Sequence, residues 1–167
     1  MGDPRKLKRK FETPKKIWDS DRIEKEKGLL LEFGLKNMRE LWVTQKELKK
    51  IRRQARLLLA QGERGVQKGK ELLSKVVRLG LAKEGATLES LLSLNIQDIL
   101  DRRLQTRVFK KGLARTMKQS RQLIIHGFIA IKDRKITAPS YMVPVNEESL
   151  LTYYKAIDLE PKPPTTQ

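Results

Sequence analysis

The segment from Leu100 to Val143 opens with Leu-Asp-Arg-Arg-Leu-Gln-Thr (residues 100–106) and closes with Pro-Ser-Tyr-Met-Val (139–143). Just before and within it, apolar residues recur at every fourth position: Ile96, Leu100, Leu104 and Val108. This spacing predicts a helix that buries one face and ends near Gly112. Basic residues fill its other face, so one side can pack while the other meets an anion.

A second helix is expected from Thr116 to Ile125 or His126. The Thr116 hydroxyl can cap the first turn while Gln119, three residues later, reaches back to the backbone. Gly127 suits the position just past the helix end. Free N–H groups and the positive end of the helix dipole at Thr116 would suit a phosphate group.

The hydrophobic pattern changes after the second helix to a period of two. Residues 128–132 and 136–138 alternate in this way around a polar turn, which predicts a short hairpin with Ile129 and Ile131 facing the core. A closing strand is expected from the residues around Val145 and 150–154. Two helices and a short antiparallel sheet therefore predict a small α+β module.

The preceding part of the chain is expected to be mostly helical. Helices are predicted over 21–33, with Asp21 and Glu24 as a cap pair, over 44–62, beginning at Thr44, and over 72–79, with shorter pieces at 37–42 and 87–92. In the longest helix, basic residues outside the apolar stripe have few acidic neighbours. We interpret this face as a phosphate-binding surface, although a solvated surface would show the same pattern.

Charge indicates a nucleic-acid partner. The 167-residue chain carries a formal net charge of +17 with a pI near 10.2, which favours binding to a polyanion. We expect no membrane contact, because no stretch resembles a spanning helix or a signal peptide, and a cytoplasmic location. Without cysteine there can be no disulfide or zinc knuckle, and we expect no metal, cofactor or small-molecule substrate.

The first nineteen residues are basic, with Phe11 and Trp18 interleaved. Such a segment is expected to stay extended until it binds, and the aromatic rings favour base stacking over a merely solvated tail. The proline-rich residues 157–167 are expected to form a flexible tail.

Enzyme motifs are absent from the sequence. The run Gly65–Glu71 is one residue short of a phosphate loop and lacks its Ser or Thr. His126, the single histidine, has no nearby nucleophile or carboxylate set, so capping or packing competes with RNA contact as its role. We therefore expect no catalytic activity.

Several sequence blocks together resemble a known family. They are Leu-Asp-x-Arg-Leu-Gln-Thr, Gly112-Leu113-Ala114, residues 119–124, His126-Gly127 and Pro139-Ser140-Tyr141. This order resembles the alpha-L RNA-binding domain of the small-subunit ribosomal protein four family, in its archaeal or eukaryotic-like form. Phe128 stands where the family pattern has the last residue of His-Gly-His, so a polar contact there is not carried over.

The resemblance implies a structural ribosomal protein that binds small-subunit ribosomal RNA and neighbouring ribosomal proteins and nucleates assembly. A nucleolar assembly factor that binds precursor ribosomal RNA is the alternative, and a DNA-binding helix-turn-helix protein is a third possibility. The implied organisation is a basic extension (1–19), a helical domain (20–94), an alpha-L domain (95–156) and a tail (157–167).

The predicted RNA-binding residues form three groups. Those in the module are Arg102, Arg103, Gln105, Arg115, Thr116, Lys118, Arg121, Gln122, His126 and Lys132. The long helix contributes Arg52, Arg53 and Arg56, and the N-terminal extension contributes Arg5, Lys6, Lys8 and Arg9.

Overall fold

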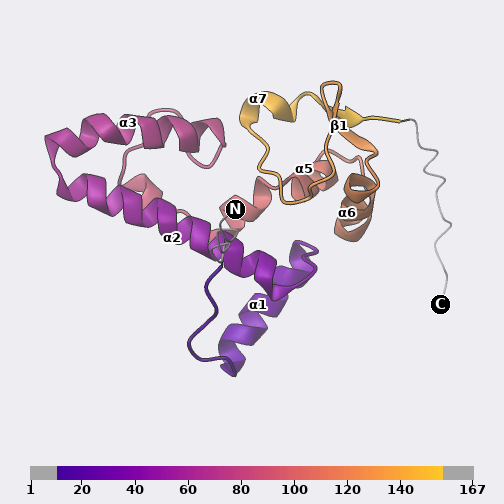
Figure 1. Cartoon of the computed structure of the whole chain (residues 1–167), viewed down its shortest axis with the longest axis horizontal. Coiled ribbons are helices and arrows are strands. Elements are labelled where there is room, and N and C mark those ends of the chain that lie inside the picture. The colour runs from indigo at the N-terminus through magenta and orange to yellow at the C-terminus, as the bar shows by residue number, and fades with distance from the viewer. Residues whose placement is uncertain (1–10, 156–167) are drawn as a thin grey trace, which may run out of the picture.

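The computed structural model describes residues 11–155, so the predictions for Arg5, Lys6, Lys8, Arg9 and the tail 157–167 lie outside the described residues. Figure 1 shows α3 lying along α2, α1 projecting from the start of α2, and the C-terminal elements gathered on the other side. In chain order the elements are α1 (Ser20–Glu32), α2 (Met38–Ala60), α3 (Glu63–Arg78), the short 3-10 turn η1 (Ser90–Leu92), α4 (Ile96–Asp101), α5 (Leu104–Lys110), α6 (Met117–Ile125), β1 (Ile129–Ile131), β2 (Arg134–Lys135), α7 (Val145–Glu148) and β3 (Leu151–Tyr153).

Helix α1 begins one residue earlier than predicted. Asp19 rather than Asp21 caps it, because the Asp19 carboxylate accepts from the backbone N–H of Arg22 at 3.4 Å. The buried Glu26 then joins α1 to α2, since its carboxylate accepts from Arg22 at 2.6 Å and from the indole of Trp42 at 3.3 Å.

The predicted helix start at Thr44 is wrong, because α2 is continuous from Met38. Asn37 caps it by accepting from the backbone N–H of Glu40 at 3.2 Å. The Thr44 hydroxyl instead donates back to the carbonyl of Glu40, one turn earlier, at 3.0 Å. A mid-helix Thr that bonds in this way looks like a cap in sequence alone.

Helix α3 packs closely against α2 at Gly65, where a Cβ atom would lie 1.8 Å from the carbonyl oxygen of Leu58. A Cβ atom at Gly69 would lie 2.8 Å from Leu88, in the turn before η1, so this glycine makes room for that side chain. The run that resembles a phosphate loop lies inside α3. The core between the helices is apolar and includes Leu48, Ala55, Val76, Leu88 and Leu91.

The single helix predicted over 96–111 is broken into α4 and α5 at Arg102 and Arg103. Arg103 has extended backbone, and residues 141–143 lie alongside the break. There the N–H of Leu104 donates to the carbonyl of Tyr141 at 2.7 Å, and the N–H of Val143 donates to the carbonyl of Arg102 at 2.9 Å. Leu104 is still fully buried, so the predicted apolar stripe is confirmed although the helix is not continuous.

The α6 cap and the hairpin are confirmed. The Thr116 hydroxyl accepts from the N–H of Gln119 at 3.1 Å. The sheet is antiparallel with the order β2-β1-β3, and β1 buries Ile129 and Ile131 as predicted. Val145, which was expected in the closing strand, begins the short helix α7 instead, and β3 follows it.

A separate apolar cluster joins the N-terminal helical part to the α+β module. Phe33, Leu35 and Leu41 from the N-terminal part pack with Leu100 of α4, and Met117 of α6 lies against the same cluster. The helical part and the α+β module thus share buried surface, which fixes how their outer faces are placed relative to one another.

Candidate nucleic-acid interface

Three predicted RNA-binding residues are buried and bind the protein itself. Arg102, Arg103 and Gln105 are 7%, 5% and 1% exposed. Arg102 donates to the carbonyls of Leu79 at 2.7 Å and Val143 at 3.4 Å. These side chains therefore hold elements of the protein together.

A carboxylate that sequence analysis overlooked organises this region. Glu40, in the first turn of α2, accepts from Arg103 Nη2 at 2.7 Å and from both terminal nitrogens of Arg121 at 2.7 and 3.2 Å. Burial of Glu40 raises its pKa, but the hydrogen bonds and charges of Arg121 and Arg103 outweigh burial and hold the pKa below its ordinary value. The guanidinium of Arg121, a predicted RNA contact, is thus already paired.

Gln105 connects the same elements through its amide. Its nitrogen donates to the carbonyls of Gly34 and Met117, each at 3.0 Å, and its oxygen accepts from Arg121 at 3.4 Å. Gly34 has a positive φ of 56°, and a Cβ there would lie 2.7 Å from that of Met117. We call Glu40, Arg103, Gln105 and Arg121 the polar joint, because they link α2 to α5 and α6.

A second carboxylate, that of Glu148, also pairs with arginines of the module. Glu148 of α7 accepts from Arg102 at 3.1 Å and from Arg107 at 2.7 Å. Lys111 donates to the carbonyls of Glu148, Ser149 and Leu151 at 2.7 to 3.3 Å. These cations therefore anchor the segment that leads into β3.

The remaining predicted residues of the module lie at the surface. Arg115 and Thr116 are exposed at the start of α6, although the Arg115 backbone N–H already donates to Gln119 at 2.8 Å. The other exposed members are Lys118, Gln122, His126 and Lys132. We call those on or next to α6 the α6 surface; Lys132 lies apart, between β1 and β2.

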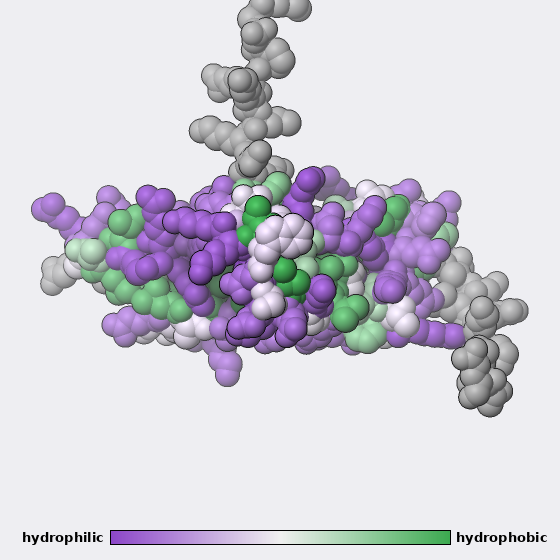
Figure 2. Space-filling view, turned by 90° about the horizontal axis from the view of Figure 1, so that it is seen from below, coloured by the Kyte–Doolittle hydropathy of each residue, from purple (hydrophilic) through white to green (hydrophobic). Residues whose placement is uncertain are grey.

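Helix α2 carries a second exposed basic area. Arg53 and Arg56 are exposed, whereas Arg52 is half-buried and donates to the carbonyl of Leu94 at 2.5 Å. Arg53 and Arg56 line a hollow of about 760 Å³ together with lysines that the predicted site omitted. Its lining residues are Glu12, Lys46, Lys49, Lys50, Arg53, Arg56 and Leu57. We call it the α2 surface. Seen from below, the molecule is mostly hydrophilic, with apolar side chains in small patches (Figure 2).

Within residues 11–155, no cluster of three or more acidic or histidine side chains is arranged to hold a metal ion. None of the helices in this range is both long enough and apolar enough to span a membrane. Exposed cations on rigid helices can hold phosphate groups by charge and geometry.

Comparison with known proteins finds similar chains. Residues 102–149 match the S4 domain. The chain is 48% identical to the small ribosomal subunit protein uS4 of Saccharolobus islandicus (strain L.S.2.15 / Lassen #1) over 98% of this chain and 92% of that protein. The uS4 protein of Sulfurisphaera tokodaii is also 48% identical, over the whole of this chain and 96% of its own length.

Proposed function

The chain belongs to the uS4 family of small ribosomal subunit proteins, and from this we propose that it binds small-subunit ribosomal RNA and nucleates assembly of the subunit. It is a structural ribosomal protein and not an enzyme. Its net charge of +17 suits a partner made of closely spaced phosphates.

The division of its basic residues into two kinds carries this proposal. Arg102, Arg103 and Arg121 are paired with carboxylates inside the protein. In contrast, Arg53 on the α2 surface and Lys118 on the α6 surface are exposed and form no salt bridge with any residue in 11–155. In this proposal the paired arginines hold the helices in place, and the exposed basic residues contact RNA.

In this mechanism both surfaces bind one folded RNA. Double-stranded RNA hides the base edges of its deep groove, so a protein that recognises a junction reads phosphates, 2′-hydroxyl groups and shape. Two basic surfaces held at a fixed angle bind only RNA helices that meet at a matching angle. The polar joint and the shared apolar cluster supply that fixed angle.

The partners proposed for the chain follow from the same family. It would sit in the small subunit of a cytoplasmic ribosome, beside other ribosomal proteins, with no membrane or small-molecule ligand. Relatives named as ribosomal subunit proteins favour a permanent component over a transient assembly factor.

The test is affinity for a small-subunit ribosomal RNA junction, an unrelated folded RNA and duplex DNA, measured across a salt series. We expect the junction to be preferred at high salt, where nonspecific phosphate binding weakens. The double variant Arg53→Ala/Lys118→Ala should lose affinity, while Lys83→Ala, an exposed lysine outside both surfaces, should not. Equal binding of all three nucleic acids would contradict the proposal.

A further inference from the structure

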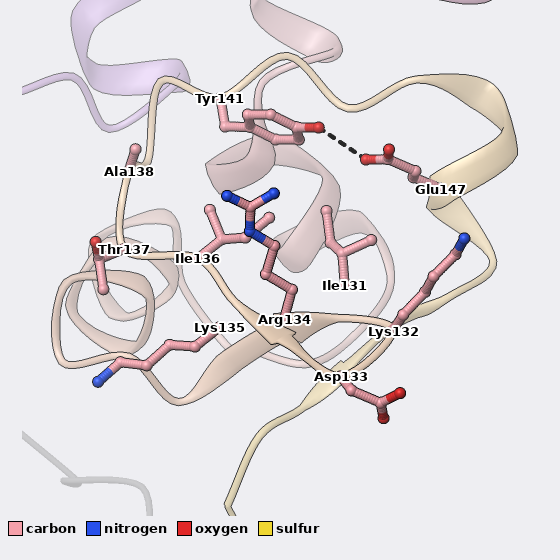
Figure 3. Close-up of a pocket in the computed structure, with 10 residues that line it drawn as sticks. All are labelled: Ile131, Lys132, Asp133, Arg134, Lys135, Ile136, Thr137, Ala138, Tyr141 and Glu147. Atoms are coloured by element: carbon pink, nitrogen blue, oxygen red, sulfur yellow. Dashed lines mark hydrogen bonds between the residues drawn. The ribbon is translucent and has the colours of Figure 1, made fainter.

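A hollow beside the hairpin is used by none of the contacts described so far. It has a volume of about 840 Å³ and lies between the β1–β2 hairpin and the chain from Ala138 to Glu147. Figure 3 shows its lining. A hollow of this size can admit a planar ring system.

Its floor and one wall are apolar. Ile131 is buried in the module core, Ile136 packs against that core, and the ring of Tyr141 is half-buried beside them. The Tyr141 hydroxyl donates to Glu147 Oε2 at 2.8 Å, which fixes the ring (Figure 3). Oxygen Oε1 of Glu147 accepts no hydrogen bond from residues 11–155, so it can take a donor from a ligand.

Arg134 differs from the buried arginines of the module. Its side chain is exposed, and it makes no hydrogen bond or salt bridge within residues 11–155. In Figure 3 it extends from the hairpin into the hollow, toward Tyr141 and Glu147. The hydrogen bond to Glu147 and burial raise the pKa of Tyr141, and the charge of Arg134, which extends toward the phenol, acts against them (Figure 3). A planar guanidinium above an apolar floor is suited to stack on a ring.

We propose that this hollow receives one unstacked RNA base, and that the base is guanine. The inference rests on the proposed RNA binding and names a contact within it. Single-stranded bases in RNA are recognised by stacking on aromatic or guanidinium planes and by hydrogen bonds to their Watson–Crick edges. Guanine presents two adjacent donors, N1–H and N2–H, on that edge. They match the carboxylate of Glu147, because Oε1 accepts no hydrogen bond within residues 11–155 and Oε2 has a second lone pair besides the one that accepts from Tyr141.

The rim fits a nucleotide chain that enters and leaves. Lys132 and Lys135 stand on either side of Arg134 in the hairpin sequence and line the hollow, and their side chains extend to different sides in Figure 3. Both are exposed, so phosphates on either side of the inserted base can meet a cation. An acidic peptide could use these charges, but it would leave the apolar floor unfilled.

The experiment titrates the full-length protein with the single-stranded RNAs UUGUU, UUAUU and UUUUU and follows the methyl signals of Ile131 and Ile136. We expect UUGUU to bind about tenfold more tightly than the others and to shift these signals, consistent with the usual strength of base stacking and pairing. Arg134→Ala should weaken binding of all three RNAs by about tenfold. Lys83→Ala, an exposed lysine outside the hollow and outside both basic surfaces, should leave the affinities and the methyl shifts as in the parent.

Glu147→Gln keeps an oxygen for the Tyr141 hydroxyl but no longer offers guanine two carboxylate oxygens. We expect it to remove the preference for UUGUU over UUAUU and UUUUU; an unaltered urea midpoint would show that the fold is intact. Equal binding of the three RNAs, or methyl shifts with an acidic pentapeptide and not with RNA, would overturn the inference. If the ribosomal RNA junction still binds, the proposed function survives that failure, and if it does not, both fail.

Discussion

Replacing Glu40 with alanine tests whether the polar joint holds the two halves together. The change leaves Arg103, whose side chain is 6% exposed, without its carboxylate, and removes both bonds from Arg121. Breaking a buried ion pair by removing one partner costs about 3–5 kcal/mol. Because the side chains of Glu40 and Arg121 are each 19% exposed, water replaces part of the loss, and we expect about 3 kcal/mol.

The assay is urea unfolding followed by far-ultraviolet circular dichroism. The matched control is Asp101→Ala, which breaks the Asp101–Lys110 pair, 2.8 Å long but with side chains 39% and 47% exposed. An exposed pair contributes about 0–1 kcal/mol, so the control should unfold close to the parent. If Glu40→Ala and Asp101→Ala lowered the free energy of unfolding equally, the polar joint would carry no special role.

The same carboxylate gives a pH dependence with a definite sign. The folded-state pKa of Glu40 lies below its ordinary value of 4.5, so its contribution to stability is fully present above that value. It is lost as pH falls through the folded-state pKa. The stability gap between the parent and Glu40→Gln should therefore be constant near neutral pH and shrink in acid, and a gap that widened in acid would refute the assignment.

Three further changes test the core, the backbone and the surface. Leu104→Ala, at a fully buried position, should lower the free energy of unfolding by about 2–5 kcal/mol in urea, and a parent-like midpoint would contradict its place in the core. Gly34→Ala, at φ 56°, should lower the free energy of unfolding by about 1–2 kcal/mol through backbone strain, and contact of the new Cβ with Met117 should lower it further. Gly28→Ala, in an open helical position, should not destabilise the protein. Lys118→Ala should reduce the salt dependence of RNA binding by a slope of about 0.7–0.9 without changing stability, and an unchanged slope would remove Lys118 from the interface.

Short-range sequence patterns predicted several helices, strands and buried faces of this chain correctly. The spacing around Leu104, the Thr116 cap and the alternation at Ile129 and Ile131 each identified an element or a buried face. Each of these signals lies within one element, where side chains a few residues apart determine the outcome. The break at Arg103 was missed because it depends on residues 141–143, which lie far along the chain.

The roles of individual arginines could not be predicted in the same way. Glu40 lies 63 positions from Arg103 and 81 from Arg121, so no spacing rule connects them. An arginine paired inside the protein and one facing RNA look alike in sequence. Arg134, set in an apparent polar turn, was likewise passed over, and only the folded hairpin shows that it extends over an apolar hollow.

The use of ion pairs at the joint has a consequence for heating. The cost of removing charged groups from water falls as temperature rises, whereas stabilisation from buried apolar area levels off. As temperature rises, the pairs of Glu40 with Arg103 and Arg121 should therefore contribute a larger share of the free energy that holds the helical part and the α+β module together. The two halves should remain docked up to the melting point of the whole chain and then unfold in one transition.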